Sequence, residues 1–376
     1  MQSRRASPCI AVHRRASPCI AVLRRVLPYL AVPCRVSCSA RVVIQSMDFS
    51  GKSVLITGGT GSFGNAFARH LLQNTAAQRI VIYSRDEYKQ FVMRQALQEH
   101  DRRLRFFIGD IRDEGRLLRA LNGVDYVVHA AAMKQVPACE YNPIEAVSTN
   151  VNGAVNLINA ALDSGSVRKV VALSTDKAVS PINLYGGTKL VSDKLFAAAN
   201  SYSGGAGCRF AIVRYGNVAG SRGSVIPFFR EQIRTGVKLL PLTDERMTRF
   251  WMTLDGAVRL VAKAFDLAKG GETFVYKNPS FYVKDLIEAI NPGGGYKVAG
   301  IREGEKLHEC MITSADTRTT YEYDGFYVIY PQYDWWSRES DVLPGGVCVE
   351  RNWEYTSDRN TWWLSTGDLR QRCEAV

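Results

Sequence analysis

The most constraining stretch of this 376-residue sequence is a glycine-rich turn between an apolar run and a helical pattern. Residues 53–57 read SVLIT, and Gly58, Gly61 and Gly64 follow in TGGTGSFG with a G-x-x-G-x-x-G spacing. Such glycines allow a tight turn and let a pyrophosphate approach the helix N-terminus, whose free N–H groups favour anions. We therefore predict a dinucleotide site that includes Gly58, Thr60, Gly61, Ser62, Phe63 and Gly64.

Short apolar runs alternate with helical stretches along the following part of the chain. Further runs of this kind cover 79–84, 105–110, 124–132, 169–175 and 209–218. Strands that alternate with helices indicate an α/β fold with a doubly wound parallel sheet. We expect a Rossmann-like nucleotide-binding domain at 47–218. Residues 219–376 are expected to form mostly a smaller substrate-binding lobe and a C-terminal tail, packed where the strands end and ligands bind.

Residues 1–46 differ from the rest of the chain in charge and in pattern. They contain eight Arg and no acidic residue, and they repeat units such as RRASPCIAVH with a ten-residue period. Without them the basic residues fall from 48 to 40 against 36 acidic ones, so the formal net charge drops from +12 to +4. The remaining chain has no basic run interleaved with aromatics, so we expect no nucleic-acid binding. The extension is interpreted as a non-essential, disordered segment, with organellar import as the alternative.

Membrane and metal functions are not indicated by the sequence. It has no run of about 18 apolar residues, so no membrane span is expected. Four of the nine Cys lie in the extension, and the five at positions 139, 208, 310, 348 and 373 form no CxxC pair or Cys/His ligand spacing. We expect reduced thiols, no metal and a cytoplasmic protein.

The end of the second predicted strand indicates which dinucleotide binds. An NAD site usually has Asp or Glu there for the ribose 2′-hydroxyl, whereas this chain has Ser84 and Arg85, with Lys89 nearby. A hydroxyl and two cations suit a 2′-phosphate, so we predict NADP, although Asp86 could face the ribose instead. Asp110 is predicted to accept a hydrogen bond from the adenine amino group. The other predicted cofactor residues are Ile111, Ala130, Lys134, Tyr185 and Lys189.

The stretch STDKAVSPINLYGGTK (174–189) carries a Tyr and a Lys four positions apart. If 185–199 is helical, Tyr185 and Lys189 lie on one face, one turn apart. An ammonium near a phenol lowers its pKa from about 10. Tyr185 could then remove a hydroxyl proton as hydride leaves the same carbon, with a hydroxyl donor, Ser174 or Thr175, shortly before it in the chain.

These motifs resemble those of the extended short-chain dehydrogenases/reductases, and within them the soluble inverting UDP-N-acetylglucosamine 4,6-dehydratases of nonulosonic (pseudaminic) acid pathways. The resemblance runs from about residue 49 to about residue 364. It rests on ITGGTGSFG, YSRDE, FFIGDIRD, HAAAMKQVPACEYNP, STDKAVSPINLYGGTKLVSDKLF, VRYGNVAGSRGSVIPFF, MTRFW, IREGEKLHE and NTWWL. It implies a hydro-lyase that acts on UDP-N-acetylglucosamine and forms a homo-oligomer.

The resemblance also implies catalytic roles for Asp176 and Lys177, beside Thr175, Tyr185 and Lys189. Oxidation at C4 of the sugar makes a ketone, which acidifies the C5 proton. Lys177, held neutral by burial and neighbouring cations, is expected to remove that proton, and protonated Asp176 to donate to the departing C6 hydroxyl. Return of hydride to C6 and reprotonation of C5 from the other face would give a UDP-2-acetamido-2,6-dideoxy-L-arabino-hexos-4-ulose. The division of the acid and base roles stays open.

Two residues favour the inverting branch over its alternatives. Related sugar-nucleotide dehydratases commonly have Asp–Glu after the Thr, where this chain has Asp and Lys177, and the membrane-anchored retaining relatives tend to have Met in place of Tyr185. A retaining dehydratase or a UDP-sugar 4-epimerase is the alternative. A non-catalytic NADP-binding sensor is the remote one, because this chain keeps both the glycine-rich turn and the Tyr/Lys pair.

Substrate contacts are expected from loops that follow the strands. Lys134, after the fourth strand, should lie near the cofactor or sugar, and Asn217 should lie beside the sugar. Arg222 and Arg302 are candidates for the UDP diphosphate, because a planar guanidinium meets phosphate oxygens bidentately. The predicted substrate-binding set is Lys134, Lys177, Asn217, Val218, Arg222 and Arg302.

Overall fold

A computed structural model of the chain describes residues 48–100, 102–204, 207–336 and 338–375. The predicted extension at 1–46, with its repeat, lies outside the described residues. The strands are β1 Ser53–Thr57, β2 Arg79–Ser84, β3 Leu104–Ile108, β4 Tyr126–His129, β5 Lys169–Thr175, β6 Arg209–Tyr215, β7 Leu240–Leu242, β8 Thr248–Phe250, β9 Thr273–Tyr276, β10 Ser280–Tyr282, β11 Tyr296–Val298, β12 Cys310–Ile312, β13 Thr320–Tyr323, β14 Phe326–Ile329, β15 Val347–Cys348 and β16 Tyr355–Thr356. The helices are α1 Ser62–Asn74, α2 Glu87–Ala96, α3 Glu114–Ala120, α4 Val136–Tyr141, α5 Pro143–Val147, α6 Gly153–Asp163, α7 Leu184–Ala199, α8 Val225–Arg234, α9 Leu254–Leu267, α10 Val283–Ile290, α11 Arg338–Asp341 and α12 Thr366–Glu374.

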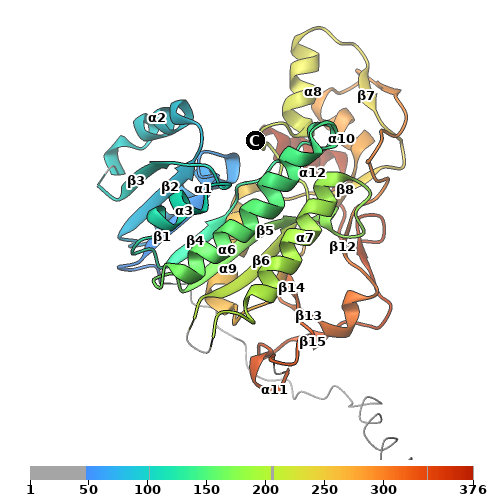
Figure 1. The fold of residues 1–376 in the computed structure, drawn as a ribbon. Helices are drawn as coiled ribbons and strands as arrows, with labels where there is room; N and C mark the ends of the chain where they lie inside the picture. Colours follow the sequence, from blue (N-terminus) through green and yellow to red (C-terminus); the bar gives the residue numbers. More distant parts are fainter. Residues whose placement is uncertain (1–47, 101, 205–206, 337, 376) are drawn as a thin grey trace, which may run out of the picture. The chain divides into compact units, whose positions relative to one another are not determined.

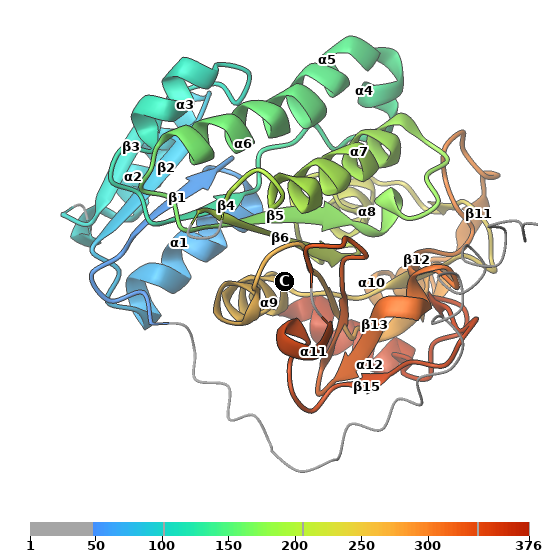
Figure 2. The same cartoon turned by 60° about the horizontal axis from the view of Figure 1, so that its bottom comes forward.

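Ten of the described strands form one sheet in the order β15-β13-β14-β9-β6-β5-β4-β1-β2-β3. Neighbouring strands from β3 to β9 run parallel, and β14, β13 and β15 add an antiparallel edge. Helices α3, α6 and α7 cover one face, and α1 and α9 cover the other (Figure 2). The predicted α/β fold with a doubly wound sheet is confirmed.

The sheet extends past the position where the sequence pattern changes. β9 pairs in parallel with β6, so residues beyond 218 contribute to the central sheet as well as to a separate lobe. The runs expected at 124–132 and 209–218 are also shorter as strands, because β4 ends at His129 and β6 at Tyr215. The chain leaves the sheet at these two points and forms the loops that carry predicted site residues.

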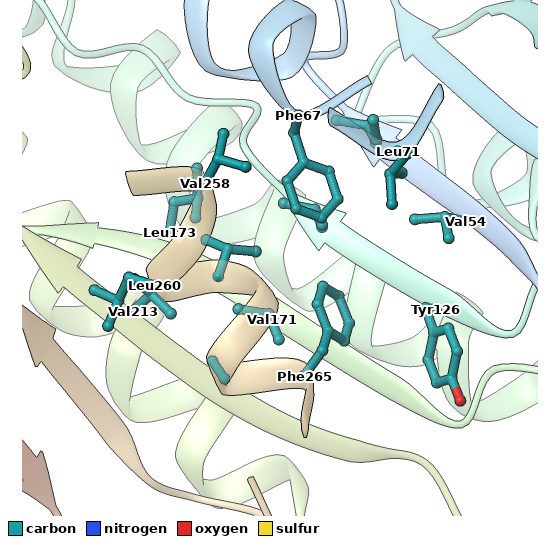
Figure 3. Close-up of a cluster of buried hydrophobic side chains, with 14 of the residues drawn as sticks. Val54, Phe67, Leu71, Tyr126, Val171, Leu173, Val213, Val258, Leu260 and Phe265 are labelled. Atoms are coloured by element: carbon teal, nitrogen blue, oxygen red, sulfur yellow. The ribbon is translucent and has the colours of Figure 1, made fainter. Parts of the chain in front are cut away.

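The face covered by α1 and α9 holds a core of apolar side chains (Figure 3). Phe67 and Leu71 of α1 and Phe265 of α9 are fully buried against strand residues such as Val171. The Phe67 and Phe265 rings lie 6.4 Å apart between centroids. Burial of each such side chain contributes about 1.5–3 kcal/mol, and this packing keeps the carboxyl ends of the strands in fixed relative positions.

A second apolar cluster holds the smaller lobe together. Its buried members include Ile226 and Phe229 of α8, Phe281 of β10 and Leu286 of α10, together with Trp251. Figure 1 shows α8, β7 and α10 close together and apart from β1, β2 and β3. The residues of this cluster fall within 219–376, where the smaller lobe was expected, and between α8 and α10 the chain returns to the sheet through β9.

The described residues also bear on membrane, metal and cysteine chemistry. No helix there is long and apolar enough to cross a membrane. No group of His, Cys, Asp and Glu within the described ranges is arranged to hold a metal ion. The five Cys of these ranges are free thiols.

Candidate active site

A cavity of about 690 Å³ lies at the carboxyl ends of the parallel strands, between the sheet and the smaller lobe. It brings together twenty of the predicted site residues. They are Gly58, Thr60, Gly61, Ser62, Phe63, Gly64, Ser84, Arg85, Lys89, Ile111, Ala130, Lys134, Thr175, Asp176, Lys177, Tyr185, Lys189, Asn217, Val218 and Arg222. Two predicted residues, Asp110 and Arg302, do not line this cavity.

The glycine-rich turn has the geometry that a pyrophosphate needs. Gly58 has a φ of +63°, and a Cβ there would lie 2.9 Å from the carbonyl oxygen of Ala130. A Cβ on Gly64 would collide with the backbone of Gly59, so the turn packs tightly onto α1. The N-cap of α1, Gly61, supplies no side-chain hydrogen bond. The first N–H groups of α1 are therefore without a side-chain cap and fit an anionic group at this helix end.

The contacts of the side chains after β2 indicate which of them are free to reach the ribose of a cofactor. The Asp86 carboxylate caps α2 by accepting from the Lys89 N–H at 2.9 Å, and it also pairs with the Lys89 ammonium. Ser84 is buried, and its hydroxyl accepts from Gln90 Nε2 at 3.0 Å. Arg85 has a side chain 61% exposed. The Asp86 carboxylate is thus already bonded to the N-terminus of α2 and to Lys89, whereas the guanidinium of Arg85 is accessible to solvent.

Asp110 lies outside the cavity wall. Its carboxylate accepts from the Arg112 N–H at 3.0 Å and from Arg112 Nη2 at 2.8 Å. Arg85 Nη1 lies 3.7 Å from the same carboxylate. Two guanidinium groups thus lie beside the Asp110 carboxylate, and its predicted hydrogen bond from the adenine amino group stays a prediction.

The Asp176–Lys177 pair stands at the end of β5, on a helical turn that covers Asp176–Ala178. Lys177 Nζ donates to Asp176 Oδ1 at 3.1 Å, to Glu309 Oε1 at 3.0 Å and to Asn217 Oδ1 at 3.4 Å. Thr175 Oγ1 donates to Asp176 Oδ1 at 2.9 Å. Asp176 and Glu309 are both buried, with 0% and 1% of their surface exposed. One ammonium is therefore shared by two carboxyl groups that are shielded from water.

The charges around this turn set the protonation of both groups. Burial, together with the negative charge of Glu309, raises the pKa of Asp176. Burial would lower the pKa of Lys177, but Asp176 and Glu309 outweigh it, and the net effect is an increase. The expectation of a neutral Lys177 is thus wrong for this structure. Its closest charged neighbours are carboxyl groups, with Arg249 as the opposing cation.

Tyr185 and Lys189 lie one turn apart at the start of α7, as predicted. The helix begins after Asn183, whose Oδ1 accepts from the Gly186 N–H at 2.8 Å. A Cβ on Gly186 would collide with the carbonyl oxygen of Lys177, so glycine lets α7 approach the catalytic turn closely. The Tyr185 phenol and the Asp176–Lys177 pair thereby face the same cavity.

The pKa of Tyr185 differs from the sequence-based expectation. Burial raises it to about 12, with the charge of Lys177 and a hydrogen bond to Thr175 acting in the opposite direction. Lys189 is itself 3% exposed, and burial lowers its pKa while Asp193 opposes that change. The expected decrease in the pKa of Tyr185 is therefore not met in this structure, because the desolvation of the phenolate outweighs the charge of Lys177.

Three site residues were not singled out by sequence reasoning. Glu309 and Arg249 contact each other, with Arg249 Nε 3.6 Å from Glu309 Oε1. Asp193, one turn beyond Lys189, accepts from Ser174 Oγ at 2.6 Å. Glu309 and Arg249 belong to the quoted motifs IREGEKLHE and MTRFW, but a single sequence does not show that these motifs meet at Lys177.

Arg222 lies against the glycine-rich turn. Its backbone N–H donates to Ser62 Oγ at 3.1 Å, and its guanidinium donates to the carbonyl oxygen of Thr60. Burial, together with the charge of Arg222, lowers the pKa of the neighbouring Lys134. Arg222 was expected at the UDP diphosphate, but the contacts in this structure are with the predicted cofactor turn.

A second cavity of about 400 Å³ adjoins the first through residues that line both, including Asn217 and Val218. Its wall combines aromatic and charged side chains. It is lined by Phe228, Phe229, Trp251, Phe281, Arg249, Arg302 and Glu305, among others. The predicted substrate residue Arg302 is therefore placed here, away from the glycine-rich turn.

The parallel sheet, the uncapped glycine-rich turn and the Tyr185–Lys189 pair define a nucleotide-binding α/β enzyme of the extended short-chain dehydrogenase/reductase class. Residues 54–331 match the family described as polysaccharide biosynthesis protein. The chain belongs to this family.

Comparison with individual proteins agrees with this assignment. The chain is 50% identical over 326 residues to the UDP-N-acetylglucosamine 4,6-dehydratase (inverting) of Campylobacter jejuni subsp. jejuni serotype O:23/36 (strain 81-176), covering 85% of this chain and 97% of that protein. It is 44% identical over 288 residues to the UDP-glucose 4-epimerase of Rickettsia prowazekii (strain Madrid E), covering 75% and 83%. The resemblance to the inverting dehydratases is confirmed.

Two solved structures resemble the described fold. The X-ray structure of Pen from Bacillus thuringiensis has a TM-score of 0.80 and 37% identity, covering 88% of this chain and 99% of that chain. A dTDP-glucose 4,6-dehydratase from Streptomyces venezuelae with NAD bound has a TM-score of 0.61 and 27% identity, covering 68% and 86%.

Proposed function

We propose that this protein is a hydro-lyase that dehydrates UDP-N-acetylglucosamine across C5 and C6, oxidises C4 and inverts C5, with NADP as its cofactor. The observation that carries the proposal is the meeting of Asp176, Lys177 and Tyr185 in one cavity with the glycine-rich turn. An acid, a base and a phenol are the groups that this reaction requires. A relative named for the same reaction covers 85% of the chain at 50% identity.

The glycine-rich turn and its helix end would hold the cofactor, which when bound would accept and later return one hydride. Tyr185 would take the proton of the C4 hydroxyl. A phenol with a pKa of about 12 is a poor base at neutral pH. Lys189, one turn away, is placed to stabilise the phenolate once a further positive charge enters the site.

Asp176 and Lys177 would then act on the C4 ketone. Removal of the C5 proton leaves electrons that expel the C6 hydroxyl as water when an acid donates to it. Asp176 is suited to be that acid, because burial and Glu309 raise its pKa. Lys177 acts as the base in the fraction of the enzyme whose Nζ has released its proton to water, and this Nζ lies 3.1 Å from Asp176 Oδ1 and 3.0 Å from Glu309 Oε1. Reprotonation of C5 from the opposite face inverts that centre.

The choice of NADP rests on the residues after β2. Asp86 is occupied as the cap of α2, so it is poorly placed to bind a ribose 2′-hydroxyl. Arg85 is 61% exposed at the rim of the cavity and can bind a 2′-phosphate. Arg85 and Lys89 thus favour the phosphorylated dinucleotide.

The adjoining cavity is proposed to hold the UDP part of the substrate. Phe228, Phe229, Trp251 and Phe281 offer apolar surface to a pyrimidine ring, and Arg302 offers a guanidinium to the diphosphate. Asn217 and Val218, which line both cavities, would then lie beside the sugar.

A homo-oligomer in the cytoplasm is part of the same proposal. Both features are carried over from the resemblance to the soluble inverting dehydratases. Light scattering of the purified full chain tests the oligomer: a mass near a multiple of 41.8 kDa supports it, and a mass of 41.8 kDa contradicts it.

A UDP-sugar 4-epimerase is the second candidate, because relatives that carry that name are 44% identical to the chain. An epimerase product has the mass of its substrate, whereas a dehydratase product has lost one water. Mass spectrometry after incubation of the full chain with UDP-N-acetylglucosamine and NADP separates the two. Loss of one water supports the proposal, and an unchanged mass with altered C4 configuration contradicts it.

A further inference from the structure

Glu309 comes from a part of the chain distant from β5, just before β12, yet its carboxylate reaches the catalytic turn. Glu309 Oε1 lies 3.0 Å from Lys177 Nζ, across 132 positions of sequence. Its backbone is fixed by Ser357, whose Oγ accepts from the Glu309 N–H at 2.9 Å and whose N–H donates to the Glu309 carbonyl at 2.8 Å. These two hydrogen bonds fix the Glu309 backbone at a position from which its side chain reaches Lys177.

Arg249 is a second cation beside the same carboxylate. Arg249 Nε lies 3.6 Å from Glu309 Oε1. The guanidinium is itself held by three carbonyl oxygens, those of Thr248 at 2.7 Å, Lys306 at 2.9 Å and Leu307 at 3.1 Å. A buried carboxylate between two cations is stabilised in its charged form. Glu309 therefore carries a fixed negative charge beside the catalytic pair.

Asp176 stands in a different environment from Glu309. It shares Lys177 with Glu309, but within the part of the chain that the structure describes no second cation forms an ion pair with it. Asp176 Oδ2 and Glu309 Oε2 are both buried without a hydrogen-bond partner among the described residues, so the two carboxyl groups differ in the second cation, Arg249, beside Glu309. A charged, unpaired carboxylate oxygen is costly in such a place, and a protonated one is much less so. When two buried carboxyl groups share one ammonium, the one without a second cation beside it keeps the proton.

We propose that Glu309 is a positioning residue for the dehydration step: its buried carboxylate holds the Lys177 side chain and keeps Asp176 in the acid form. The inference rests on the proposed function, because it concerns the acid and base of that reaction. The direction of the pKa shift of Asp176, upward through burial and Glu309, agrees with the geometry.

The other charged or titratable groups that face this cluster come from several elements. Tyr185 of α7 faces Asp176, Arg249 of β8 and Lys306 face Glu309, and Asp193 of α7 acts on Tyr185. Replacement of Glu309 leaves all of these in place. A change in the titration of the catalytic pair in Glu309→Gln is thus assigned to the lost charge.

The test compares the pH dependence of kcat/KM for the full-length wild type, Glu309→Gln and Glu309→Asp. Removal of the negative charge lowers the pKa values of both Asp176 and Lys177. The bell-shaped profile of Glu309→Gln should therefore move to lower pH by about one unit or more. Glu309→Asp keeps the charge, so its profile should stay near that of the wild type while its rate falls. A slower Glu309→Gln with an unshifted profile would mean that Glu309 is merely structural and would overturn the proposal.

Glu272→Gln is the matched control. Glu272 is also 1% exposed, and its carboxylate accepts from the Lys269 and Gly270 N–H groups, at 2.7 Å each, outside both cavities. It should not shift the profile, whatever it does to stability. A shift as large as that of Glu309→Gln would show a general effect of losing a buried carboxylate and would contradict the proposal.

A second readout does not depend on turnover. Selective ¹³C labelling of Asp carboxyl carbons, with Asp176→Asn to assign the signal, gives the titration midpoint of Asp176 directly by NMR. A wild-type midpoint well above the ordinary value of about 3.9, which falls in Glu309→Gln, supports the inference. A midpoint at or below that value overturns it, even if Glu309→Gln does not fold. If the wild type makes no dehydrated product, the proposed function fails, and this titration still decides the role of Glu309.

Discussion

Arg222 and Ser62 lie 160 positions apart, and the Arg222 backbone N–H donates to Ser62 Oγ at 3.1 Å. The Arg222 guanidinium also donates to the Thr60 carbonyl oxygen, so the loop after β6 is fastened to the glycine-rich turn. Because the smaller lobe begins directly after this loop, the contact links the lobe to the cofactor turn. It also places a cation where a pyrophosphate would bind.

Arg222→Ala should therefore release the dinucleotide faster than the wild type does, by about tenfold if one charge-assisted hydrogen bond is lost. The measurement is the dissociation rate of bound NADP in the full chain. Arg234→Ala is the control, because Arg234 is 74% exposed and pairs with Glu231 on α8. Unchanged NADP release together with weaker UDP-sugar binding would instead assign Arg222 to the substrate diphosphate.

Arg85→Ala should weaken NADP binding and leave NAD binding nearly unchanged. Arg85 is expected to contact the 2′-phosphate, which NAD lacks, and loss of that contact should raise the Kd for NADP by about tenfold. Calorimetric titration of the same variant with both dinucleotides provides its own control. An equal increase in the Kd values for NADP and NAD would show that Arg85 does not contact the 2′-phosphate.

Tyr185→Phe should lower kcat by about 10²–10⁴-fold, the usual contribution of a positioned acid or base. NADP binding should persist, because Phe keeps the ring. Tyr202→Phe is the matched control, since Tyr202 is 71% exposed, just past the end of α7. Steady-state rates of the three proteins decide the point. If Tyr185→Phe retains most of the activity, another group removes the C4 hydroxyl proton.

His129 should make the fold sensitive to acid. Its Nδ1 lies 2.9 Å from Thr57 Oγ1, and burial lowers its pKa to about 3. An unfolded chain takes up that proton near pH 6.5, so the free energy of unfolding should fall as pH drops from about 6.5 toward 3. The slope from this group is at most about 1.4 kcal/mol per pH unit. Urea titrations should show a shallower pH slope for His129→Gln. An identical slope would mean that His129 accepts a proton in the folded protein.

The fold and the cofactor turn follow from local patterns. An apolar run, three spaced glycines and a helical stretch predict β1, the turn and α1 because each depends on neighbouring residues. The pairing of Tyr185 with Lys189 was predictable for the same reason, since four residues make about one helical turn. The roles of Glu309 and Arg249 depend instead on which distant segments meet, and no local pattern specifies that.

The pKa expectations failed for a related physical reason. Lys177 was expected to be neutral through burial and neighbouring cations, and Tyr185 was expected to be acidified by Lys189, one helical turn away. The structure adds Glu309 to Lys177 and encloses the Tyr185 phenol, and these long-range effects reverse both directions. Burial and distant charges become known only when the fold is known.

Proton NMR of the reaction in D₂O tests the central claim most directly. The full-length protein is incubated with NADP and UDP-N-acetylglucosamine, and the product is followed at C5 and C6. The account predicts a new C6 methyl signal and an inverted C5 that carries deuterium, because C5 is deprotonated and then reprotonated from the other face. A methyl group with retained C5 configuration, or an intact C6 hydroxyl, would contradict it.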